Sequence, residues 1–156
     1  MRFLGIDPGA TRIGYGLIEG TRDPKLVAYG VIEIEASGES NRLLELSLAF
    51  EKLLASAAPA VAGVERIFFS KNRKTGIAVA QARGVIIAKI AGQGIPIVEW
   101  HPSAVKLAVT NYGLADKQAV AKMVGKILGV SEFDGHDDAT DALAIAIATA
   151  FNHTRG

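Results

Sequence analysis

The pattern of apolar and polar positions in the first part of the chain predicts three strands. Arg2–Asp7, Ile13–Glu19 and Leu26–Glu35 are short, mostly apolar segments of the kind that form strands. Pro8–Thr11 has the composition of a turn, and the alternation within Val31–Glu35 indicates a half-exposed edge. Because the connections between these strands are short, we expect them to pair as an antiparallel meander.

Beyond this meander the apolar residues follow a helical period, interrupted by two short apolar runs. The first helix carries its apolar residues on one face between Leu43 and Leu54, with Ser40 or Asn41 as the expected N-cap. A meander followed by alternating helices and strands predicts an α/β fold, with a mixed five-stranded sheet and helices on both faces. The further predicted segments are strands Ala60–Glu65 and Ile95–Trp100, and helices Thr75–Gly94, Pro102–Val109, Asp116–Gly129 and His136–Phe151.

Length and composition restrict the classes of protein that the chain can belong to. A length of 156 residues fits one domain over 1–156, and 49% hydrophobic residues supply a core. The sequence has no cysteine, which excludes disulfides and thiolate metal sites and favours hard cations held by oxygen ligands. Asp7 and Pro8 come too early for a signal peptide, and Ala142–Phe151 is too short to span a bilayer. We therefore expect a cytoplasmic protein with no membrane partner.

Charge is nearly balanced over the whole chain but not along it. The net charge is +1, from 17 Lys and Arg against 16 Asp and Glu. Such asymmetry can create a phosphate-binding face, and a solvated basic surface explains it equally well. Between Glu65 and Asp116 the only acid is Glu99, whereas the basic residues are Arg66, Lys71, Arg73, Lys74, Arg83, Lys89 and Lys106.

Four acids stand at the ends of predicted elements, where their convergence would create a metal site. Asp7 and Glu65 end two strands, and Asp138 and Asp141 share one face at the start of the last helix. Each has an ordinary explanation, as a turn former or as an acid in a first helical turn. Together they predict carboxylates that bind a pair of magnesium ions about 4 Å apart, suited to attack of water on a phosphodiester. The spacing alone leaves the substrate open.

Longer stretches around these acids resemble the RuvC family of Holliday-junction resolvases. The resemblance runs in order from the first residue to about Ala148, nearly the whole chain. The segments that carry it are GIDPGATRIGYGLIE, VERIFFSKNRKT, AQARGV, the Pro102–Lys106 stretch and DATDALAIAIA.

The resemblance implies an RNase H-like fold and a homodimer that nicks four-way DNA junctions symmetrically with Mg²⁺, for which Mn²⁺ can substitute. It implies a branch-migration partner of the RuvA–RuvB type. It places Phe68 near the crossover and Lys106 and Lys117 near the scissile phosphate, while Lys71, Arg73 and Lys74 fit phosphate attraction. In this reading the catalytic and metal-binding acids are Asp7, Glu65, Asp138 and Asp141.

Several alternatives remain open from the sequence. His136 and Asp137 directly precede Asp138, so a shift of one residue is possible, although Asp138 aligns without a gap and His136 fits a place beside the site. An RNase H-like nuclease acting on structured RNA or an RNA–DNA hybrid is the nearest rival function. An actin-like phosphotransferase, suggested by the Asp-Pro-Gly-Ala-Thr run, and a junction-binding scaffold that does not cut are further possibilities.

Small residues recur every four positions along the predicted helix Thr75–Gly94 and could form a dimer contact. Such a row permits close approach of a second helix, flanked by apolar side chains at Val79, Ile86, Ile87 and Ile90. The alternative is that the row lets the helix lie close to its own sheet. The row consists of Gly76, Ala80, Gly84, Ala88 and Gly92.

Overall fold

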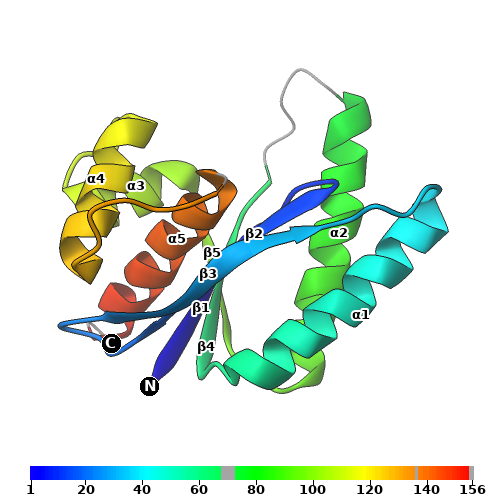
Figure 1. The fold of residues 1–156 in the computed structure, drawn as a ribbon, viewed down its shortest axis with the longest axis horizontal. Helices are drawn as coiled ribbons and strands as arrows, with labels where there is room; N and C mark the ends of the chain where they lie inside the picture. Colours follow the sequence, from blue (N-terminus) through cyan, green and yellow to red (C-terminus); the bar gives the residue numbers. More distant parts are fainter. Residues whose placement is uncertain (68–72, 136, 155–156) are drawn as a thin grey trace.

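The structure is a computed structural model that describes residues 1–67, 73–135 and 137–154, with the side chains at 73 and 74 left out (Figure 1). Its sheet has the strand order β3-β2-β1-β4-β5. The strands are β1 (Arg2–Asp7), β2 (Arg12–Glu19), β3 (Lys25–Glu33), β4 (Val61–Glu65) and β5 (Ile97–Trp100). The helices are α1 (Glu39–Ala57), α2 (Arg73–Gly92), α3 (Pro102–Thr110), α4 (Lys117–Leu128) and α5 (Asp137–His153).

Strand pairing confirms the mixed sheet. β1, β2 and β3 pair antiparallel as the predicted meander, with β3 at the edge. β4 pairs parallel with both β1 and β5. Because β1 and β4 are parallel neighbours, their C-terminal residues Asp7 and Glu65 lie at the same edge of the sheet.

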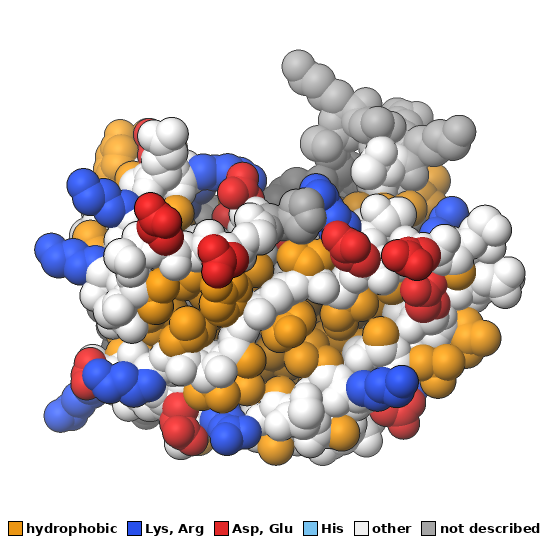
Figure 2. Space-filling model, in the orientation of Figure 1, with side chains coloured by type: hydrophobic (Ala, Val, Ile, Leu, Met, Phe, Trp, Pro, Cys, Tyr) orange, Lys and Arg blue, Asp and Glu red, His pale blue; other side chains and the backbone are white. Residues whose placement is uncertain are grey.

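Helices cover both faces of the sheet, as the sequence predicts. α1 and α2 lie on one side, and α3, α4 and α5 lie on the other (Figure 1). Successive residues of a strand serve opposite cores: Leu4 and Ile6 pack with α1 and α2, whereas Phe3 packs with α5. By the same alternation Asp7 belongs to the α5 face. On the side seen in Figure 2, apolar side chains lie on both sides of the β3 backbone and charged ones surround them.

Three glycines form a row across the sheet beneath α5. Gly5 of β1 is paired with Gly16 of β2 and Gly63 of β4. A β-carbon at Gly5 would overlap the carbonyl group of Ala142, and one at Gly16 would overlap the backbone of Leu143. At Gly63 a β-carbon would collide with the hydroxyl of Thr149 and the side chain of Ile145. The backbone of α5 therefore lies directly against three strands.

Helix caps agree with the sequence at α4 and disagree at α1. Asp116 accepts a hydrogen bond from the amide of Ala119 at 2.7 Å, and Gly129 ends α4 with φ 68°, both as predicted. The expected Ser40 or Asn41 cap of α1 is wrong. The N-cap is Gly38, with φ 85° and no side-chain cap, and Asn41 instead donates to the Ser37 carbonyl. Glycine makes this turn by adopting a positive φ, so the helix begins before either polar residue can cap it.

The inner face of α2 packs in the core, and Gly84, Ala88 and Gly92 of its row of small residues face outward. Ile86 and Ile90 are fully buried in the core with α1, so the expectation that they flank a dimer contact is wrong. The same helix exposes Ile77, and a β-carbon at Gly84 or Gly92 would meet no atom within 4 Å. The alternative explanation, that the small residues let α2 lie close to its own sheet, therefore does not apply to Gly84 and Gly92.

One stretch of the described chain, residues 75–92 of α2, is long and apolar enough to cross a membrane by length and composition. Core helices of soluble proteins pass the same test, so this observation is weak evidence for a membrane span. Only 17% of the stretch is buried, which leaves its apolar surface to be explained.

The glycine row predicts a large loss of stability when one member gains a methyl group. Gly5→Ala should lower the free energy of unfolding by about 1–3 kcal/mol, because the new β-carbon meets the backbone of α5. Gly92→Ala is the matched control, since its β-carbon enters open space at a helix end, and its effect should stay within about 0.5 kcal/mol. Urea unfolding measures both; equal stability of the two variants would contradict the close contact.

Candidate metal centre

Three carboxylates meet where α5 begins. Asp7, Asp138 and Asp141 each offer an oxygen, and these oxygens lie within 4.8 Å of one another. The backbone brings them together because Gly14, the β2 partner of Asp7, lies directly under Asp138. A β-carbon at Gly14 would overlap the Asp138 carbonyl, so the first turn of α5 is held beside the end of β1.

Glu65 lies next to this cluster at the end of β4. Its side chain shares a hydrogen bond with Asp7, and burial together with this contact raises the pKa of Asp7. Burial, followed by the negative charges of Glu65, Asp141 and Asp138, raises the pKa of Asp7 to about 8. Burial also raises the pKa of Glu65 and of Asp141. The four acids repel one another when ionised, and a bound proton or cation relieves the repulsion.

The acids line one wall of an open cleft of about 330 Å³. Residues of α3 and α4 form the opposite wall, among them Val105, Lys106, Lys117 and Val120. Lys117, the residue after the Asp116 cap of α4, places its ammonium 3.4 Å from a carboxylate oxygen of Asp141, which raises the lysine pKa. The cleft thus combines clustered carboxylates with cationic groups at its rim.

Arg12 is a charged neighbour of the site that the sequence reasoning missed. Its guanidinium lies 3.4 Å from a carboxylate oxygen of Asp138. The available signal was the hairpin itself: a strand that returns directly after Asp7 brings the first residues of β2 back past that acid. Arg12 of β2 therefore contacts Asp138, and Lys117 of α4 contacts Asp141.

Asp137 and Asp138, the two acids between which the sequence left the register open, differ in their position relative to the cluster. Asp138 joins the acidic cluster, and the more exposed Asp137 does not belong to the group of three. Phe68, Lys71 and His136 lie outside the described residues. Arg73 and Lys74, two of the other predicted basic residues, are the first residues of α2, the next element along the chain after β4.

Carboxylate oxygens from three elements form a ligand set suited to a hard divalent cation. Such ions take oxygen ligands and commonly bind through a small number of carboxylates, with water or phosphate completing the shell. Asp7, Asp138 and Asp141 already have ligand atoms close together, and Glu65 is hydrogen-bonded to the group. The residues present therefore fit a divalent metal.

Comparison with known proteins connects this geometry to one family. Residues 3–149 match the family model for crossover junction endodeoxyribonuclease RuvC. Proteins of that name from Caldicellulosiruptor saccharolyticus and Syntrophomonas wolfei are 44% and 46% identical to the chain, each over 94% of it and over 90% and 87% of their own lengths.

Solved structures give the same result. Thermus thermophilus RuvC in complex with a Holliday junction superposes with a TM-score of 0.92, at 30% identity, covering 100% of this chain and 96% of that one. The yeast mitochondrial Holliday junction resolvase Ydc2 shares the fold with a TM-score of 0.66 at 19% identity, covering 98% of this chain and 82% of its own.

The raised pKa of Asp7 predicts how stability depends on pH. The pKa of this carboxyl is near 3.8 in the unfolded chain and about 8 in the folded protein. Because the folded state holds the proton more tightly, its contribution to stability is complete below the unfolded pKa and is lost as pH rises through the folded one. In EDTA the melting temperature should therefore fall between about pH 5 and pH 9.

Two further measurements assign this fall to the acidic cluster. Asp7→Asn should remove much of it, because the amide does not ionise. Mg²⁺ should raise the melting temperature of the unmodified protein most at the alkaline end, where the acids are charged. A fall of equal size in the Asp7→Asn protein would show that other groups cause it.

Proposed function

Because the chain belongs to the RuvC family of crossover junction endodeoxyribonucleases, we propose that it resolves Holliday junctions in recombination and DNA repair by nicking two strands symmetrically. The observation that supports this function is the meeting of four acids with Lys106 and Lys117 on one open cleft. A cleft open to solvent admits a phosphodiester backbone. Its acids attract cations, and its lysines attract phosphate.

We assign metal binding to the four acids. Asp7, Glu65, Asp138 and Asp141 would hold two Mg²⁺ ions, with Mn²⁺ as a substitute. When bound, these ions supply an activated water and charge stabilisation at the phosphate. Lys117 faces the same cleft and is held by Asp141, and Lys106 approaches from α3, so both can orient the scissile phosphate. His136 is proposed beside this group and not among its ligands.

The remaining assignments concern DNA and partners. Phe68 would stack near the crossover, and Lys71, Arg73 and Lys74 would attract the backbone. A single nuclease domain over 1–156 would act in the cytoplasm as a homodimer together with a RuvA–RuvB type branch-migration complex.

The first test replaces the acids one at a time. Asp7→Asn, Glu65→Gln, Asp138→Asn or Asp141→Asn should reduce nicking of a mobile four-way junction at least about a thousandfold, because several kcal/mol of charge stabilisation are lost. Junction binding in Ca²⁺ should persist, since basic residues, and not the acids, contact the phosphates and recognise the shape of the junction. Nick mapping and gel-shift titration measure the two quantities.

Asp137→Asn is the matched control, because it removes the same charge from the same turn of α5. It should keep near-normal nicking. The reverse result, with loss at Asp137 and activity at Asp138, would move the metal site by one residue. Faster cutting of an RNA–DNA hybrid or structured RNA than of the junction would favour the rival nuclease function.

The exposed row of α2 supports the homodimer. A β-carbon at Gly84 meets no atom within 4 Å, Ala88 is exposed, and Ile77 exposes 58% of its surface. A smooth apolar ridge of this kind lets a second helix approach closely and bury area. A two-fold dimer also places two cleavage sites symmetrically on one junction.

Gly84→Leu tests this contact. The open space around Gly84 means that leucine does not strain the monomer, so the folded variant should sediment as a monomer where the unmodified protein sediments as a dimer. Ala55→Leu, an equal kind of enlargement on the exposed side of α1, is the control and should leave the dimer intact. A stable Gly84→Leu dimer would exclude this face of α2.

A further inference from the structure

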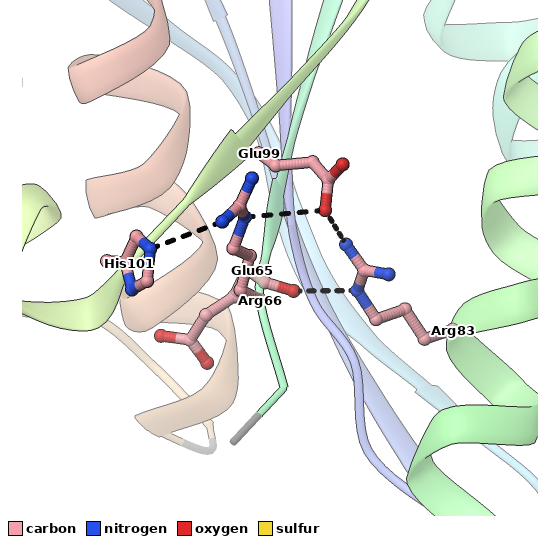
Figure 3. A network of polar contacts seen from close by, with 5 residues as sticks. All are labelled: Glu65, Arg66, Arg83, Glu99 and His101. Carbon is pink, nitrogen blue, oxygen red and sulfur yellow. Dashed lines mark hydrogen bonds and ion pairs between the residues drawn. The ribbon is translucent and has the colours of Figure 1, made fainter.

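Arg83 of α2 is hydrogen-bonded to the backbone of a site residue. Its Nε donates to the carbonyl oxygen of Glu65 at 3.0 Å, and its Nη2 pairs with the carboxylate of Glu99 on β5. Figure 3 shows the carbonyl oxygen of Glu65 facing Arg83, while the Glu65 carboxylate points to the other side of the strand. One guanidinium therefore joins α2, the end of β4 and β5.

Glu99 organises this contact from the sheet. It is the only acid between Glu65 and Asp116, and one of its oxygens contacts both Arg83 and Arg66, the latter at 3.6 Å. Arg66 also approaches His101 Nε2 at 3.3 Å, and its amide donates to the Trp100 carbonyl at 2.8 Å. The side chain of Arg83 is 17% exposed, against 50% for Arg66, so the Arg83 contact is the better shielded of the two.

We propose that Arg83, held by Glu99, is a positioning residue that fixes the end of β4 and so keeps the Glu65 carboxylate at the metal cluster. This inference rests on the proposed function for its activity readout. Glu65 is the last residue of β4, and just beyond it the Arg66 amide donates a backbone hydrogen bond to the Trp100 carbonyl of β5. A planar guanidinium that donates in two fixed directions restrains both the position and the rotation of this peptide group.

The contact also connects α2 to the site. The same helix carries Arg83 toward Glu65 and Gly84 on its open side. A shift of α2 would move the carbonyl group of Glu65 through this hydrogen bond. The geometry of each metal centre thus depends on the seating of the helix that we assign to the dimer contact.

The test compares Arg83→Met with Lys89→Met. Methionine keeps much of the apolar stem and removes the donors. Lys89 lies on the same helix, but its ion pair at 3.1 Å is with Glu51 of α1, away from β4. Arg83→Met should weaken Mg²⁺ or Mn²⁺ binding, measured by calorimetry without DNA, by about 10- to 100-fold, as for other residues that orient metal ligands. Lys89→Met should leave metal affinity unchanged.

Kinetics provide a second readout. In single-turnover assays at limiting Mg²⁺, Arg83→Met should lower the nicking rate of bound junction, while the junction Kd in Ca²⁺ stays within about twofold because DNA contacts are intact. Glu99→Gln, which retains Arg83 and an acceptor for it, should show a smaller loss. Arg83→Lys should restore part of the metal affinity, because an ammonium donates without the planar fork.

The outcomes separate the inference from the proposed function. An Arg83→Met protein that melts at a lower temperature but binds metal and nicks normally would overturn the positioning role. If Arg83→Met does not fold, unchanged metal affinity in both Arg83→Lys and Glu99→Gln would overturn it equally. If the unmodified protein cuts no junction, the proposed function fails, and the calorimetric comparison still decides the role of Arg83.

Discussion

The backbone of α5 lies against the backbone of the sheet, because the strands beneath it present Gly16, Gly5 and Gly63 side by side. Any side chain in this row would push the helix away from the sheet. The first turn of α5, with Asp138 and Asp141, would then move out of reach of Asp7. The arrangement of the acids therefore depends on the absence of side chains at positions that are not themselves part of the acidic cluster.

The same close packing creates an electrostatic conflict. Four acids share a partly buried region, and the contacts at its edge include ion pairs from Arg12 to Asp138 and from Lys117 to Asp141. Both cations are largely exposed, at 49% and 73% of their side chains, so water screens their attraction. Two monovalent side chains compensate the cluster only in part. A divalent cation between the carboxylates would compensate it at the point where the charges converge.

The sequence predicts those parts of the fold and site that depend on local order. Asp7 and Glu65 end strands that are evident as apolar runs in the sequence. The Asp116 cap depends only on residues that are neighbours in the chain. The row of Gly5, Gly16 and Gly63 cannot be found this way, because it exists only once the register of three strands is set.

Other features of the structure could not be predicted from the sequence, for related physical reasons. Helix α2 consists mostly of apolar and small residues, so periodicity does not reveal its inner face, and the expectation for Ile86 and Ile90 is wrong. The roles of Arg12 and Arg83 depend on long side chains that cross between elements. Gly38 takes the place of the expected α1 cap because glycine adopts a positive φ two or three residues before Ser40 and Asn41.

Every residue of α5 from Ala142 to Ala150 is buried, since the helix has the sheet on one side and α3 and α4 on the other. An ordinary amphipathic helix tolerates substitutions along its solvent-exposed face, so positions that stabilise the fold are separate from those that carry the chemistry. Between Ala142 and Ala150 this helix has no solvent-exposed face. A saturation-mutagenesis profile across it would show a continuous band of intolerance, without the helical rhythm. The acids in its first turn could then vary in evolution only together with the core that carries them.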